Sequence, residues 1–100
     1  MIKIVLCCDL TKKVGYQISE FISKDSDTIV NVVVPTNNDT LGKSIKELFP
    51  NAIIHKNGTS DSGGFNDIVK HANIDWGILA MGGGILSKEQ ILIPKYGFIN

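Results

Sequence analysis

The chain has 100 residues, of which 43% are hydrophobic and 20% are charged, and its ten basic residues balance its ten acidic ones. This length predicts a single domain, and this composition is typical of globular proteins. The absence of a lysine and arginine stripe disfavours a nucleic-acid partner. The apolar first residues are too few for a membrane span or a signal peptide, so the cytoplasm is the expected location.

The first half of the chain alternates between strand and helix patterns. Residues 2–8 are almost continuously apolar, which predicts a buried parallel strand. Apolar residues recur at helical spacing from Val14 to Ile22, and Thr11 is a suitable cap for this helix. A β-branched run over residues 28–34 predicts a second strand, and the apolar spacing over residues 41–49 predicts a second helix.

The second half continues this alternation. Residues 52–55 predict a short third strand, and residues 65–72 predict a third helix after a loop rich in Gly, Ser, Thr and Asp. The apolar residues 76–81 predict a fourth strand. The segment 87–90, Ser-Lys-Glu-Gln, has the spacing of a capping box at the start of a short helix, and residues 97–100 predict the last strand.

Strands that alternate with helices predict an α/β fold with a parallel sheet. We therefore expect a Rossmann-like, three-layer αβα domain over residues 1–100, with about five short strands. In such sheets, ligands bind beyond the carboxyl ends of the strands. Three stretches are expected at those ends, namely Asp9–Lys13, Gly82–Leu86 and Asn100.

The run Gly82-Gly83-Gly84 follows a buried strand and permits close approach of a ligand to the backbone. The same run is equally compatible with a plain connection between a strand and a helix. It is not a dinucleotide-binding fingerprint, because that motif follows the first strand, and residues 8–13 contain no glycine.

Five other residues could carry chemistry, but their sequence context favours structural roles. Cys7 and Cys8 are expected to be small buried residues, although a reactive Cys8 thiolate beside the following lysines is the alternative. Asp9 is expected to be a turn residue rather than a nucleophile. His55 and His71 lack a recognisable Ser or Cys partner, so neither is expected to be a catalytic base.

Residues from Asp75 to Asn100 resemble the segment that enters the active-site strand of the folate-dependent formyltransferases. In that family an Asp introduces the fourth strand, as Asp75 does here, and a strand ending in Ile-Asn leads into a His-Pro-Ser-Leu-Leu-Pro-like segment. The resemblance implies that Asn100 is the catalytic Asn. It also implies that the pterin ring of 10-formyltetrahydrofolate is held by Met81, Gly82, Gly83, Gly84, Ile85 and Leu86.

The activity implied by this resemblance is the transfer of a formyl group from 10-formyltetrahydrofolate to a small-molecule amine. The family also uses a His and an Asp, which would follow Asn100, and neither His55 nor His71 matches them. We therefore expect residues 1–100 to be an incomplete formyltransferase N-terminal domain that is inactive by itself. The first turn lacks both the Gly-rich loop of the glycinamide ribonucleotide branch and the Gly-Thr-Pro turn of the methionyl-tRNA branch. This leaves a sugar-nucleotide amine or another small amine as the acceptor.

Two alternatives belong to other functional classes. One is a small α/β module that binds a phosphate or a nucleotide at its Gly-rich turn without catalysis. The other is a truncated product with no independent role.

Overall fold

The computed structural model describes residues 1–10, 12–35, 42–55, 62–80 and 87–99. Strands and helices alternate throughout this part of the chain. The elements are β1 (Ile2–Cys8), α1 (Lys13–Ser23), β2 (Thr28–Pro35), α2 (Gly42–Leu48), β3 (Ile53–Ile54), α3 (Ser62–Ala72), β4 (Trp76–Ala80), α4 (Lys88–Leu92) and β5 (Phe98–Ile99).

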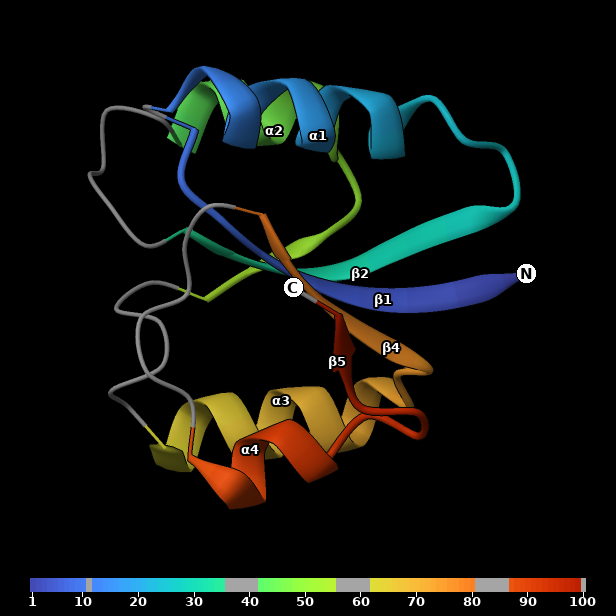
Figure 1. Cartoon of the computed structure of the whole chain (residues 1–100), viewed down its shortest axis with the longest axis vertical. Coiled ribbons are helices and arrows are strands. Elements are labelled where there is room, and N and C mark those ends of the chain that lie inside the picture. Colours follow the sequence, from blue (N-terminus) through green and yellow to red (C-terminus); the bar gives the residue numbers. More distant parts are fainter. Residues whose placement is uncertain (11, 36–41, 56–61, 81–86, 100) are drawn as a thin grey trace.

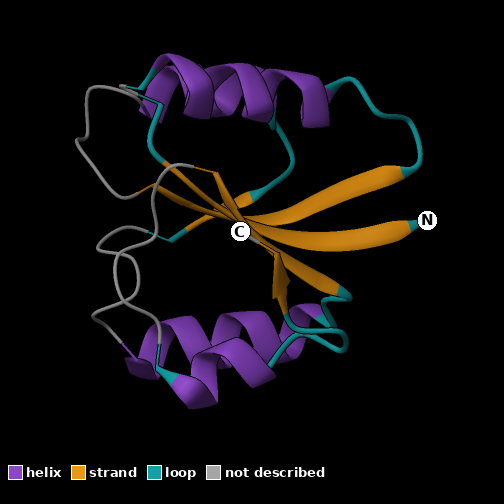
Figure 2. Cartoon of the chain, in the orientation of Figure 1, coloured by secondary structure: helices purple, strands orange, loops and turns teal. Residues whose placement is uncertain are grey.

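The five strands form one parallel sheet with the order β3-β2-β1-β4-β5. Helices α1 and α2 lie on one face of the sheet, and α3 and α4 lie on the other (Figure 1). The chain therefore winds outward from β1 to β3 and then crosses to β4 and β5. Figure 2 shows the resulting three layers, with the strands between two layers of helix. The predicted Rossmann-like α/β fold is confirmed.

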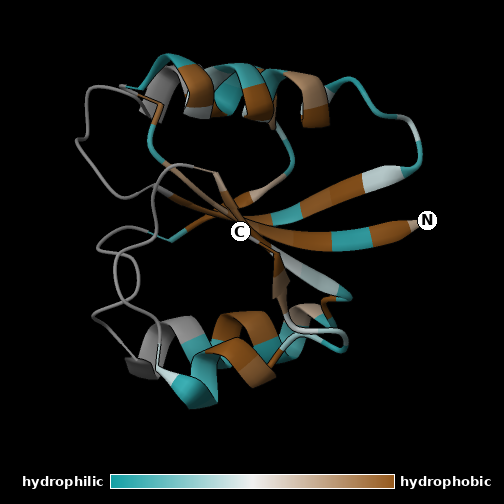
Figure 3. Ribbon diagram, in the orientation of Figure 1, coloured by the Kyte–Doolittle hydropathy of each residue, from teal (hydrophilic) through white to brown (hydrophobic). Residues whose placement is uncertain are grey.

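Strand β1 occupies the centre of the sheet, between β2 and β4. Its residues from Ile4 to Cys8 are at most 1% exposed, because helices cover both faces of a central parallel strand. Alternate β1 side chains enter two separate apolar clusters, one beneath α1 and α2 and one beneath α3. Figure 3 shows the hydrophobic central strands beside helices that mix hydrophobic and hydrophilic residues.

Element boundaries follow local hydrogen bonding. The capping box of α4 is confirmed, because the Ser87 Oγ accepts from the Gln90 N–H (3.1 Å) and the Ser87 N–H donates to Gln90 Oε1 (2.9 Å). The N-cap of α1 is Lys12 rather than Thr11, which lies outside the described residues, and the Lys12 side chain makes no capping hydrogen bond. Strand β3 is shorter than predicted, since the Ala52 N–H donates to the Phe49 carbonyl at the end of α2.

Helix α1 presents an unexpected face to the sheet. The apolar residues that predicted this helix include Val14 and Phe21, which are 50% and 78% exposed. The buried positions are instead Gly15 and Ser19. Small side chains therefore bring the α1 backbone unusually close to the sheet. Within the described part of the chain, no helix is long and apolar enough to span a membrane.

Candidate functional site

The carboxyl ends of β1 and β4 lie side by side at the centre of the sheet. Cys8 is paired with Ala80 in the parallel register. The next residue, Asp9, donates its N–H to the Ala80 carbonyl oxygen (3.2 Å), and its own carbonyl accepts from the Lys12 N–H (3.2 Å). The turn after β1 is thus tied both to the end of β4 and to the start of α1. Ligands bind at such a strand edge in many open α/β sheets.

Gly15 brings the backbone of α1 into close contact with this edge. A methyl group at Gly15 would overlap the carbonyl oxygen of Asp9 and would stand 3.1 Å from the carbonyl oxygen of Ala80. Both atoms belong to the backbone and cannot swing aside as a flexible side chain can. Helix α1 therefore packs backbone against backbone where β1 and β4 end, which a larger residue at position 15 would prevent.

Ser19 and Cys8 lie under the same turn of α1. Ser19 is fully buried, and its hydroxyl donates to the Gly15 carbonyl (2.8 Å). Burial raises the pKa of the Cys8 thiol to about 11, although a hydrogen bond with Ser19 acts in the opposite direction. Burial, reinforced by the neighbouring Cys8, raises the pKa of Cys7 to about 12. Both side chains are therefore neutral thiols near pH 7, and the alternative of a reactive Cys8 thiolate is wrong.

Asp75, which the resemblance aligned with the Asp before the fourth strand, lies at the opposite, amino end of the sheet. Its Oδ2 accepts from the Lys3 N–H (2.9 Å), and its own N–H donates to the Lys3 carbonyl (2.8 Å). Its carbonyl accepts from the Tyr96 N–H (2.9 Å). Asp75 thus joins β1, β4 and the segment before β5. These contacts are structural and give Asp75 no part in the site at the carboxyl ends.

Strands β4 and β5 lead into the two stretches that the resemblance identifies. They are parallel neighbours, with Gly77 opposite Phe98 and Ile78 opposite Ile99. The carboxyl ends of β4 and β5 therefore lie at the same edge of the sheet. The predicted site residues themselves, Met81–Leu86 and Asn100, lie outside the described residues.

The two histidines lie away from the carboxyl ends of β1 and β4. His55 follows β3, the edge strand farthest from β5. His71 is exposed in the last turn of α3, and its Nδ1 lies 2.7 Å from the Asp67 carbonyl oxygen, which can only accept a hydrogen bond. Neither histidine follows β4 or β5, and the structure brings neither of them to the site at the carboxyl ends of β1 and β4.

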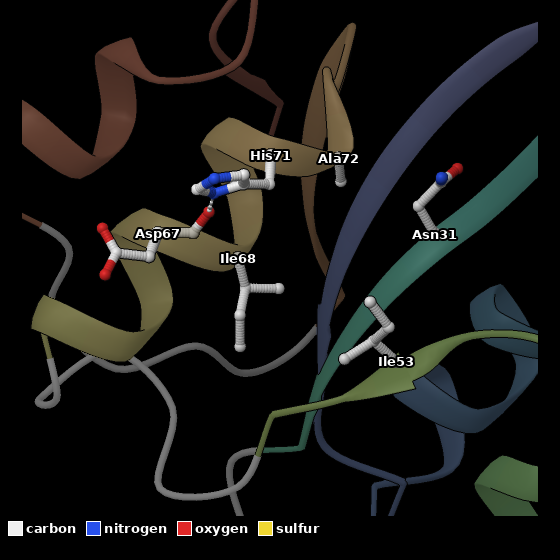
Figure 4. A pocket seen from close by; sticks show the side chains of 6 residues that line it. All are labelled: Asn31, Ile53, Asp67, Ile68, His71 and Ala72. Atoms are coloured by element: carbon white, nitrogen blue, oxygen red, sulfur yellow. Dashed lines mark hydrogen bonds between the residues drawn. The ribbon is translucent and has the colours of Figure 1, made fainter.

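Sequence reasoning missed a cavity of about 340 Å³ between α3 and the β2–β3 edge. One of its lining residues, Asn31, is an extra residue in β2, because Ile4 pairs with Val30 and Val5 pairs with Val32. Figure 4 shows Ile53 and Ile68 facing each other, whereas the Asp67 carboxylate and the His71 ring point away from Asn31. The polar groups do not converge on this cavity, so it lacks the arrangement that usually recognises a small ligand.

The comparisons leave the chain without a family assignment. The sequence matches no protein-family model and no curated protein. Among the residues that the structure describes, no group of three or more His, Cys, Asp or Glu side chains could hold a metal ion. The parallel sheet and its strand order define the class of protein, which is a parallel α/β domain with a Rossmann-like strand order.

Proposed function

We propose that the chain is the folate-binding part of an N-formyltransferase, which moves a formyl group from 10-formyltetrahydrofolate to a small-molecule amine. The observation that supports this proposal is the parallel pairing of β4 with β5. Residues 81–86 directly follow β4, and Asn100 directly follows β5. The two segments that resemble the pterin-binding and catalytic parts of the family thus extend from neighbouring strands of one sheet edge.

The residue types suit this chemistry. Formyl transfer passes through a tetrahedral oxyanion, and the side-chain NH₂ of Asn100 would donate a hydrogen bond to that oxygen. A pterin ring needs polar backbone groups around its edge and apolar packing against its face. Glycines 82–84 would expose the backbone, and Ile85 and Leu86 would supply the apolar contact.

The geometry of the turn after β1 bears on the choice of the amine acceptor. The first turn of α1 packs against the carbonyl oxygens of Asp9 and Ala80, and Asp9 is itself buried. These oxygens would repel a phosphate, so this helix start is unsuited to the role that a Gly-rich loop plays elsewhere. The same feature favours an acceptor that does not bind its phosphate there. We propose a small amine, with a sugar-nucleotide amine as the first candidate.

The test is a titration of the chain with folinic acid, a stable formyl-folate, followed by the amide resonances in a heteronuclear NMR spectrum. We expect saturable shifts that include the amide resonances of residues 81–86. Inorganic phosphate and AMP serve as the comparison ligands. Saturable binding of phosphate or AMP without any response to folinic acid would favour the binding module and reject the formyltransferase assignment.

A further inference from the structure

We propose that an amphipathic helix of a partner polypeptide packs beside α1, on the face of the sheet that carries α1 and α2. The binding surface for this helix has two apolar walls, which are a cavity lined by β1, β4 and β5 and an exposed stripe along α1. The arrangement of the two walls fits a helix, and the charges at the two ends of α1 favour one direction for it.

The first wall is a cavity of about 310 Å³. It lies on the α1 face of the sheet, because Ile4 and Ile78, which line it, belong to the apolar cluster beneath α1 and α2. Two further lining residues, Ile2 and Ile99, are 45% and 49% exposed. A sheet face of this kind is ordinarily covered by a helix, so the cavity is a place where a further helix can pack.

The second wall is the stripe on α1, formed by Val14, Ile18 and Phe21. These residues follow one another at helical spacing and share one face of α1, and Phe21 is the most exposed of the three. Asp25 follows Phe21 by about one further turn and lines the cavity, so the stripe borders the cavity. Helix α2 lies on the other flank of α1, because a different cavity joins Ser23 to the end of α2.

A helix bound here would contact the cavity with one face and the stripe with an adjacent face, so it must be apolar over both. The α1 helix of a second copy does not meet this requirement. Its stripe is apolar, but the adjacent outward face carries Lys13, Gln17 and Glu20, which are also at helical spacing. The fitting occupant is therefore a helix of another polypeptide.

The charges at the ends of α1 favour a bound helix that runs parallel to it. Asp25 is the one charged group among the described residues that line the cavity. Hydrogen bonds from the Thr28 hydroxyl (2.7 Å) and the Asp27 N–H (3.3 Å) hold the pKa of Asp25 below its usual value, so its carboxylate is ionised near pH 7. Lys12 and Lys13 lie at the amino end of α1, whose first turn has no acidic residue. A parallel helix with acidic residues in its first turn and basic residues in its last turn complements both ends.

The test uses a synthetic peptide of about 14 residues with blocked termini, leucines on one broad face, glutamates in its first turn and lysines in its last turn. Trp76 lines the cavity and is the single tryptophan, so its fluorescence reports binding. We expect a saturable change with this peptide and none with a scrambled peptide of the same composition. Phe21→Glu should weaken binding by about tenfold or more. Leu92→Glu, at a 68% exposed position of α4 on the opposite face, should leave it unchanged.

A second peptide, with the glutamates and lysines exchanged between its ends, tests the direction of the bound helix. We expect it to bind the wild-type chain about threefold more weakly, and this difference should decrease in Asp25→Asn. Failure of the first peptide to bind, or equal binding by the wild-type chain and Phe21→Glu, would overturn the proposal. Sedimentation equilibrium provides a further check. A wild-type dimer that Phe21→Glu dissociates would also overturn the proposal, because a second copy would then occupy this face.

Discussion

The contact between Gly77 and Phe98 gives the sharpest prediction about how β5 is held. Gly77 is buried in β4, and a methyl group at this position would overlap the Phe98 ring on the neighbouring strand. Only two residues form β5, so this ring is a large part of its attachment to the sheet. We expect Gly77→Ala to lower the free energy of unfolding by about 1–3 kcal/mol, the usual cost of overpacking. Strand propensity alone would predict a slight gain in stability.

A double-mutant cycle separates the two effects. In a Phe98→Ala background the overlap is gone, and Gly77→Ala should be neutral or should stabilise the chain by up to about 1 kcal/mol. Urea unfolding provides the assay, with the fluorescence of Trp76, the single tryptophan of the chain, and far-UV circular dichroism as independent probes. If Gly77→Ala lowers the free energy of unfolding by the same amount in the wild-type chain and in the Phe98→Ala chain, the ring does not lie on Gly77 and the reasoning is refuted.

Two further predictions concern amide hydrogen exchange in the sheet and the effect of the buried thiols on stability. Amide hydrogen exchange should be faster in β5 than in the central strand β1, because β5 is a two-residue edge strand, and equal protection would contradict this. Below about pH 9 the two thiols are protonated in the folded and in the unfolded chain, so they should not change the free energy of unfolding with pH. From about pH 9 to 11 the thiols of the unfolded chain lose their protons while those of the folded chain keep theirs, so the free energy of unfolding should fall. The slope should reach up to about 1.4 kcal/mol per pH unit for each cysteine and should decrease in Cys8→Ala. Rapid labelling of Cys8 by a thiol reagent in the folded chain at about pH 8 would contradict the burial argument.

The fold class could be predicted because the longest strands have strong local signals. Residues 2–8 and 28–34 are too continuously apolar or β-branched for surface strands, and they alternate with helical patterns. The order of the strands in the sheet could not be predicted from the sequence in the same way. Buried parallel strands have similar compositions, and only tertiary packing shows that β4 lies beside β1.

The packing of α1 shows why the site was harder to predict. Apolar spacing from Val14 to Phe21 located the helix, yet Gly15 and Ser19 are the positions that face the sheet. The available signal was the pair of small residues four positions apart, which lie on one face of a helix. In a helical pattern, a glycine is ordinarily interpreted as a weak helix former. Its role becomes clear only from the distance to the ends of β1 and β4.

The most direct test of the proposed function is the folinic acid titration of the wild-type chain beside Gly83→Val, with folding checked by circular dichroism. Valine is β-branched and disfavours positive φ, so it should obstruct a turn that binds the pterin through its backbone. We predict saturable binding by the wild-type chain and a loss of binding in Gly83→Val at unchanged circular dichroism. Equal binding by both chains would mean that the glycine run is a plain connector. No binding by the wild-type chain would contradict the proposed function itself.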